Sequence, residues 1–302
     1  MISKRVLITG ISGFIGQHLA RRLVRDGFEV YGIDNTILAQ KDVQVMVCDI
    51  TDREKLAQIV KDVNPGLIIH LAGFSDPSRN NNLMEKAMKI NLDGTINIID
   101  ACDKIDYEVF VNICTSDVYF GNKVPFKEDI ILNPVSPYAI SKYKAEGYAK
   151  EHAIKYDRNI ITLRPALVYG PGQKDNKFLS QAINNIIKEK EMETTRCEQK
   201  RDYIYVEDLI DAIVKILSLK DKSIIKGQVI NIGSGKQHQL KEIIHLVERI
   251  SGKKAKIKET KPYRENELFD YMLSIDKAWK LIGWLPKISI EEGIKRTVEN
   301  EI

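Results

Sequence analysis

Two side chains four positions apart, Tyr138 and Lys142, could together move a proton. They lie in the run Tyr-Ala-Ile-Ser-Lys, directly after Ser136 and Pro137. Serine followed by proline favours the start of a helix, because the serine oxygen caps the first turn and proline has no N–H to lose. Residues four apart share one helical face, and an ammonium beside a phenol of pKa about 10 favours the phenolate. The pair could be a general base, although its spacing also arises by chance.

A glycine-rich turn near the N-terminus could bind a dinucleotide. Residues 8–16 read Ile-Thr-Gly-Ile-Ser-Gly-Phe-Ile-Gly, between an expected strand and an expected helix. Gly10, Gly13 and Gly16 suit a tight turn, a pyrophosphate close to the backbone, and a helix packed on a strand. Asp34 ends the next expected strand, where a carboxylate accepts the adenine-ribose hydroxyls and repels a 2′-phosphate. The pattern therefore predicts NAD rather than NADP.

The elements around these residues alternate between strands and helices. We expect strands at 6–9, 29–33, 43–47, 67–71 and 109–113, with helices at 14–26, 53–63 and about 83–103. This alternation is typical of a parallel sheet with right-handed crossovers. Several strands are continuously apolar, which indicates helices on both faces of the sheet. The expected fold class is α/β, with a Rossmann-type doubly wound parallel sheet.

The pattern changes after Arg164 and Pro165. A turn cluster at 169–173 precedes expected helices at 178–191, 206–218, 240–250, 275–282 and 290–298, and one more strand at 229–232. We expect a first domain at 1–165, completed by about 204–233 because that strand would return to the first sheet. Residues 166–302 would form a smaller C-terminal α/β lobe.

Composition limits the classes of protein. The chain has 302 residues, of which 43% are hydrophobic, and this composition excludes disorder. Its net charge of +4 is too small to indicate a nucleic-acid partner, and we expect none. The four cysteines lack CxxC spacing, so we expect free thiols in a reducing compartment and no metal site. No apolar run reaches the length of a membrane helix. We therefore expect a cytoplasmic protein with no membrane partner.

The glycine pattern, the chain length and the second lobe resemble the extended short-chain dehydrogenases/reductases, in the NAD-dependent nucleotide-sugar epimerase/dehydratase family. The segments His70-Leu71-Ala72-Gly73 and Asn91-Leu92-Asp93-Gly94-Thr95 match further parts of its pattern, and the resemblance spans essentially the whole chain. It implies an NAD site that includes Gly10, Gly13, Phe14, Ile15, Gly16, Asp34, Asn35, Asp49, Ile50, Leu71, Ala72, Gly73, Tyr138 and Lys142.

The resemblance also implies a catalytic triad. Relative to Val118 and Tyr119, Thr115 occupies the family's catalytic Ser/Thr position, beside Tyr138 and Lys142. In the family, the tyrosine takes a proton from a sugar hydroxyl while hydride passes to the nicotinamide, and the threonine hydroxyl binds the same sugar oxygen. Asp117 matches the glutamate of the Thr-Ser-Glu form of the dehydratases but is one methylene shorter. It could instead be a loop acid exposed to water or a cap for nearby N–H groups.

The second lobe resembles the family's nucleoside-diphosphate-sugar site. Arg264 lies where a diphosphate-binding arginine is expected, and a guanidinium can bind two phosphate oxygens at once. The implied substrate residues are Ser75, Thr115, Asn176, Phe178, Arg201 and Arg264. The chain departs from the pattern at two positions, because Leu167 replaces a common asparagine and Phe120 replaces the glycine of Val-Tyr-Gly.

These features favour an NDP-sugar 4-epimerase that works through a 4-keto sugar. An NDP-4-keto-6-deoxysugar reductase and an NDP-sugar 4,6-dehydratase remain alternatives. A non-catalytic NAD-binding regulator is disfavoured by the intact triad, and a dehydrogenase of steroid or lipid alcohols by Arg201 and Arg264, which indicate an anionic substrate. The resemblance further implies a homodimer formed through the helices at 91–103 and 138–156.

Overall fold

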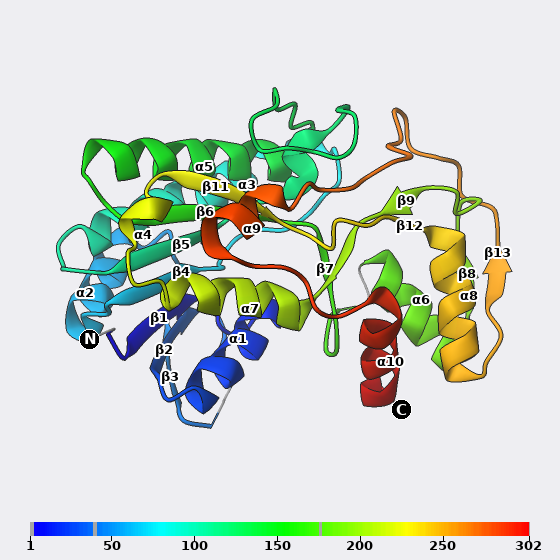
Figure 1. Cartoon of the computed structure of the whole chain (residues 1–302), viewed down its shortest axis with the longest axis horizontal. Coiled ribbons are helices and arrows are strands. Elements are labelled where there is room, and N and C mark those ends of the chain that lie inside the picture. The colour runs from blue at the N-terminus through cyan, green and yellow to red at the C-terminus, as the bar shows by residue number, and fades with distance from the viewer. Residues whose placement is uncertain (1–2, 39–40, 175–176, 302) are drawn as a thin grey trace.

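The computed structural model describes residues 3–38, 41–174 and 177–301, and a seven-stranded parallel sheet forms its centre (Figure 1). The strand order is β11-β6-β5-β4-β1-β2-β3. Their bounds are β1 (Arg5–Thr9), β2 (Glu29–Asp34), β3 (Val43–Val47), β4 (Leu67–His70), β5 (Val109–Ile113), β6 (Ile160–Pro165) and β11 (Gln228–Ile232). The order reverses between β1 and β4, which is where doubly wound sheets bind their ligands.

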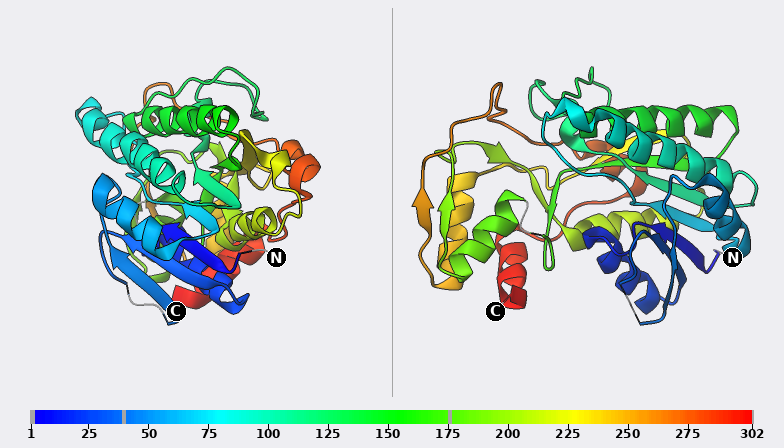
Figure 2. Two further views of the ribbon diagram at one scale, coloured as in Figure 1. Left: turned by 90° about the vertical axis from the view of Figure 1, so that its left-hand side faces the viewer. Right: turned by 180° about the vertical axis from the view of Figure 1, so that it is seen from behind.

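Helices cover both faces of this sheet, as the continuously apolar strands predict. Val6 and Ile8 of β1 pack with α1 (Phe14–Arg25) and α7 (Val206–Leu217). Leu7 points to the other face, where α2 (Arg53–Val63), α4 (Gly94–Cys102) and α5 (Pro137–Lys155) lie (Figures 1 and 2). Alternate residues of one strand thus belong to different cores.

The helix expected at 83–103 is interrupted. A short helix α3 (Met84–Ala87) leads into a π-helical segment (Met88–Asp93) before α4 begins. Within the π segment, buried Asn91 accepts the N–H of Phe74 at 2.7 Å and donates to the Phe74 carbonyl at 3.0 Å. It also donates to the Ser141 hydroxyl of α5 at 2.8 Å. The interruption therefore coincides with an amide that joins three segments near the carboxyl end of β4.

The second lobe lies at the opposite end of the molecule from β2 and β3 (Figure 1). It contains α6 (Phe178–Ile187), α8 (Leu240–Ser251) and α10 (Ile290–Glu301), while α9 (Asp276–Ile282) packs beside β11. Short strand pairs complete its described part: β7 (Leu167–Tyr169) with β10 (Tyr203–Tyr205), β8 (Glu191–Glu193) with β13 (Lys256–Lys258), and β9 (Lys200–Arg201) with β12 (His238–Gln239). The helix expected at 178–191 ends earlier, because Glu189 has a positive φ of 52° and Glu191 starts β8.

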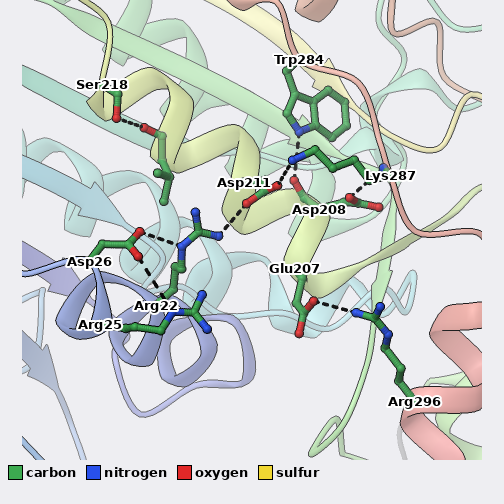
Figure 3. Close-up of polar contacts among 11 residues, drawn as sticks. Arg22, Arg25, Asp26, Glu207, Asp208, Asp211, Ser218, Trp284, Lys287 and Arg296 are labelled. Carbon is green, nitrogen blue, oxygen red and sulfur yellow. Dashed lines mark hydrogen bonds and ion pairs between the residues drawn. The ribbon is translucent and has the colours of Figure 1, made fainter.

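Ion pairs join α10 and the segment before it to the helices under the main sheet (Figure 3). Arg22 of α1 and Lys287 both bind the Asp211 carboxylate of α7, at 2.6 and 2.8 Å. Arg296 of α10 binds Glu207 of α7 at 3.1 Å. Partly exposed pairs of this kind add little stability, so their main effect is to set how the C-terminal helix lies against α7.

Two further expectations concern free cysteine thiols and the lack of a membrane helix. Cys48, Cys102, Cys114 and Cys197 are all buried and none is paired in a disulfide. Within the described residues, no helix combines the length and the apolar character that a membrane crossing needs.

Candidate active site

The carboxyl ends of the central strands open into a cleft of about 900 Å³ between the two lobes. Because parallel strands end at the same edge of a sheet, the turns that follow β1, β4 and β5 meet there. The cleft wall brings together most of the residues predicted from the sequence: Gly10, Gly13, Phe14, Ile15, Gly16, Leu71, Gly73, Ser75, Thr115, Asp117, Tyr138, Lys142, Phe178, Arg201 and Arg264. Asn176 lies outside the described residues.

The glycine turn has the geometry that a pyrophosphate requires. Gly10 has a φ of +72°, and a Cβ there would lie 2.7 Å from the backbone nitrogen of Ala72. A Cβ on Gly16 would collide with the Gly10 carbonyl. No side chain of the described chain caps α1 at Gly13, so first-turn N–H groups remain available to an anion. These features fit a bound dinucleotide.

Asp34 is the last residue of β2 and lies behind the glycine turn. Its two carboxylate oxygens accept the backbone N–H groups of Ser12 at 2.9 Å and Thr36 at 3.3 Å. Ser12 and Thr36 line the cleft, while Asp34 itself stands just behind them, next to exposed Asn35. The carboxylate is therefore held where it can accept hydroxyls from a ribose.

Besides Asp34 and Asn35, three further predicted NAD residues lie outside the cleft wall. Asp49 is exposed, and its carboxylate accepts the N–H and the hydroxyl of Thr51, both at 2.8 Å. Ile50 is buried against Gly94, where a Cβ would collide with its side chain. Ala72 supports the turn through its backbone, as described next. Their contacts with NAD stay predictions.

A hydrogen-bonded chain behind the glycine turn fixes the tautomer of His70. Thr95 donates its hydroxyl to the Asn91 carbonyl at 2.6 Å, so His70 Nε2 donates to Thr95 Oγ1 at 3.1 Å. Nδ1 then accepts the Thr9 hydroxyl at 2.7 Å, and Thr9 Oγ1 accepts the Ala72 N–H at 3.2 Å. Burial, with the charge of Lys142, lowers the pKa of His70 to about 3. A neutral histidine thus holds the segment after β4 against the glycine turn.

The start of α5 brings Tyr138 and Lys142 to the cleft. Ser136 caps the helix by accepting the Ala139 N–H at 3.1 Å, and Pro137 follows as the first helical residue. Lys142 is buried with its ammonium beside Gly73, where a Cβ would lie 3.4 Å from Nζ. Burial lowers the pKa of this lysine. Its ammonium therefore lies on the side of the cleft where Gly73 follows β4.

The protonation of Tyr138 differs from the expectation. Burial raises the pKa of the phenol well above its usual value, and the Asp117 carboxylate adds to the increase. Hydrogen bonds with the hydroxyl groups of Thr115 and Ser75 lower the pKa but do not compensate. The expectation of a lowered pKa is wrong for this arrangement of side chains, because desolvation disfavours the phenolate more than the neighbouring donors favour it.

Asp117 faces the interior of the cleft and is not a loop acid exposed to water. It is partly buried, and burial raises its pKa, while the charges of Lys177, Arg201 and Arg264 lower it. Its Oδ1 atom lies 3.3 Å from the hydroxyl of Tyr271. The carboxylate thus lies between Tyr138 and the cationic end of the cleft.

The second-lobe side of the cleft contains the predicted Arg201 together with groups that the sequence motifs did not identify. Arg201 binds the Glu267 carboxylate at 2.6 Å and the Leu268 carbonyl at 2.8 Å. Arg79 stacks 4.6 Å above the Phe120 ring and donates to the Glu265 carbonyl at 2.7 Å. Other cleft residues missed from the sequence are Lys177, Glu267 and Tyr271. Only Lys177 had a signal in the sequence, since it stands between the predicted substrate residues Asn176 and Phe178.

A buried ion pair supports α5 from below. Arg164 of β6 donates to the Glu146 carboxylate through Nε at 2.8 Å and through Nη2. Its Nη1 donates to the Tyr119 hydroxyl at 2.6 Å, which in turn donates to Asn231 of β11 at 2.8 Å. Two turns of helix separate Glu146 from Tyr138, so this network sets the height of the reactive face of α5 above the sheet.

Known proteins of one family are similar to this chain over most of its length. The model of the NAD-dependent epimerase/dehydratase family matches residues 6–233. UDP-glucuronate 4-epimerase of Thermodesulfobacterium geofontis is 31% identical over 310 residues, covering 97% of this chain and 94% of that protein. GDP-6-deoxy-D-mannose reductase of Pseudomonas aeruginosa is 28% identical over 312 residues, covering 97% of this chain and 96% of that protein.

A solved structure shares the whole architecture. MoeE5 in complex with UDP-glucuronic acid and NAD superimposes with a TM-score of 0.90 at 26% identity, covering 98% of both chains. The Rossmann-type sheet and the second lobe are therefore common to both proteins.

Proposed function

The chain belongs to the NAD-dependent epimerase/dehydratase family, and we propose that it is a nucleoside-diphosphate-sugar 4-epimerase acting through a 4-keto sugar. At the coarser level it is an NAD-dependent enzyme that modifies nucleotide sugars. The proposal depends on one observation: Thr115, Tyr138 and Lys142 line the same cleft as the glycine turn.

NAD would be held by the first lobe, residues 1–165 completed by about 204–233. The first turn of α1 would bind the pyrophosphate, Asp34 the adenine ribose, and Lys142 the ribose near Gly73. Bound NAD supplies a hydride acceptor that can return the hydride to the same carbon. Because Asp34 disfavours a 2′-phosphate, the cofactor would stay bound through the catalytic cycle.

The side chains then handle one proton at one oxygen. Thr115 would donate a hydrogen bond to the sugar O4, which aligns that oxygen with the Tyr138 hydroxyl. Tyr138 would act in its phenolate form: it would take the O4 proton as the C4–H hydride leaves and return that proton when the other face of the 4-keto sugar is reduced. Lys142 is buried and Tyr138 is partly buried, so a bound substrate would complete the exclusion of water from this transfer.

The sugar nucleotide would bind across the second lobe, residues 166–302. Arg201, Arg264 and Lys177 bring positive charge to the cleft, as a diphosphate requires. MoeE5 binds UDP-glucuronic acid, and the relative from Thermodesulfobacterium geofontis is named a UDP-glucuronate 4-epimerase, which supports a UDP-sugar. The homodimer through the helices at 91–103 and 138–156 remains part of the proposal.

Two further activities have specific support. The relative from Pseudomonas aeruginosa is named a reductase, which favours a 4-ketoreductase as the second candidate. The position of Asp117 beside Tyr138 favours a 4,6-dehydratase as the third, since the carboxylate could remove a proton from the sugar.

Mass spectrometry of the freshly purified protein separates these candidates. An epimerase or dehydratase retains NAD, whereas an empty protein that prefers NADPH would favour the reductase and contradict the proposal. Proton NMR of the loaded protein with UDP-glucose, UDP-glucuronic acid and GDP-mannose then identifies the product. Inversion at C4 supports the epimerase, and loss of the C6 hydroxyl supports the dehydratase.

A further inference from the structure

Tyr271 connects the second lobe to the turn that carries Thr115. It is 5% exposed and belongs to residues 264–274, which we call the substrate arm because Arg264 lies at its start. The end of this arm pairs with a loop of the first lobe: Phe126 donates its N–H to the Met272 carbonyl at 2.8 Å, and Ser274 donates to the Phe126 carbonyl at 2.9 Å. The backbone directly after Tyr271 is therefore held against the first lobe.

The hydroxyl of Tyr271 contacts both residues that follow Thr115. Ser116 uses its own proton to bind the Pro165 carbonyl at 2.6 Å, so its oxygen accepts the Tyr271 hydroxyl at 2.6 Å. The same phenol oxygen lies 3.3 Å from Asp117 Oδ1, which is a second acceptor. One proton is thus shared between two side chains of the catalytic turn, Thr115–Asp117.

The ring of Tyr271 packs against Phe126 of the first lobe and lies beside Arg201. It meets the Phe126 ring edge-on at 5.4 Å, and the Arg201 guanidinium lies 6.0 Å from its centroid. Arg201 also binds the Leu268 carbonyl of the substrate arm. The ring therefore supports the group expected to bind the diphosphate, while the hydroxyl supports the turn expected to bind the sugar.

We propose that Tyr271 is a positioning residue that holds the catalytic turn at a fixed distance from the substrate arm. The inference rests on the proposed function, because it assigns the turn to the sugar and the arm to the diphosphate. Thr115 must meet O4 while the diphosphate is held elsewhere, and a displacement of about 1 Å can cost about a hundredfold in rate. Tyr271 links the two ends through its ring and its hydroxyl.

Substitutions separate the two contacts. In the NAD-loaded protein, Tyr271→Phe keeps the ring and should lower kcat about tenfold, with KM within about twofold. Tyr271→Leu loses the ring as well and should also raise KM several-fold. Tyr263→Phe is the matched control: it removes a hydroxyl that binds Glu198 at 2.5 Å, just before the arm, and should leave kcat unchanged.

A double-mutant cycle tests the route through Ser116. If Tyr271 acts through that hydroxyl, Tyr271→Phe should lower kcat much less in the Ser116→Ala background than in the wild type. If the loss of kcat in the double variant equals the product of the two single losses, the proposal is overturned. An unchanged kcat in Tyr271→Phe would overturn it as well.

Hydrogen–deuterium exchange tests the link without any turnover. Backbone amides of residues 115–119 should exchange several-fold faster in Tyr271→Phe than in the wild type, and at the wild-type rate in Tyr263→Phe. Equal exchange in Tyr271→Phe and the wild type overturns the positioning role. If the wild type converts no nucleotide sugar, the proposed function fails, and the exchange rates alone decide whether Tyr271 holds the turn.

Discussion

The hydroxyl oxygen of Thr115 accepts the backbone N–H of Asp117 at 3.2 Å, so the Thr115 proton is left for another acceptor. Tyr138 is the neighbour that its hydroxyl meets in the cleft. Asp117 therefore has two effects. Its backbone N–H orients the Thr115 hydroxyl, and its carboxylate places negative charge near Tyr138.

Thr115 should be required for its hydroxyl rather than its shape. Thr115→Val keeps the volume but removes the donor, and we expect kcat to fall about a hundredfold, the lower end of what one positioned proton-handling group contributes. Thr115→Ser keeps the donor and should stay within about tenfold of the wild type. Steady-state kinetics with the preferred nucleotide sugar measures both, and equal losses in the two variants would refute this role.

Asp117 should set the pH range of the reaction. Its negative charge raises the pKa of Tyr138, and a general base must be deprotonated to act. Asp117→Asn removes that charge, so the pKa of Tyr138 falls and the ascending limb of kcat/KM should move to lower pH. Profiles of wild type and variant, recorded in the same buffers, measure the shift. A limb that moves to higher pH or stays in place would show that Asp117 does not act on Tyr138.

Asp34 should decide which cofactor is retained. In Asp34→Ala the adenine ribose loses its acceptor and a 2′-phosphate loses its repulsion, so NAD affinity should fall and NADP affinity should rise. Isothermal titration of the protein, stripped of nucleotide, with each cofactor gives both constants. Asp49→Ala compares the two predicted NAD acids, because the Asp49 carboxylate binds Thr51 outside the cleft wall. A larger loss of NAD affinity in Asp49→Ala than in Asp34→Ala would move the adenine site towards Asp49.

Breaking the buried Arg164–Glu146 pair should destabilise the protein strongly. Glu146→Gln leaves a buried guanidinium without its counter-charge, which costs about 3–5 kcal/mol in comparable pairs. Arg249→Ala, which breaks an exposed pair with Glu291, should cost less than about 1 kcal/mol. Urea unfolding measures both free energies. Similar small values for the two variants would mean that the buried pair is not needed to hold α5.

Local chemistry explains what could be predicted from the sequence. The glycine turn and the start of α5 depend on residues within a few positions of each other, and the structure has both. Tyr271 could not be found in this way, because its partner Ser116 lies 155 residues earlier in the chain. The direction of the Tyr138 pKa shift could not be predicted from the sequence either, since it depends on burial by distant segments. The π segment at Asn91 interrupts a sequence whose apolar spacing is that of a continuous helix.

The proton-handling role of Tyr138 is the centre of the account, and one variant tests it directly. Tyr138→Phe removes a single oxygen and leaves the glycine turn, Asp34 and Lys142 in place. Mass spectrometry should find as much bound NAD as in the wild type, while proton NMR should detect C4 inversion slowed by about 10²–10⁴-fold. Undiminished turnover in a variant that retains its NAD would contradict the mechanism.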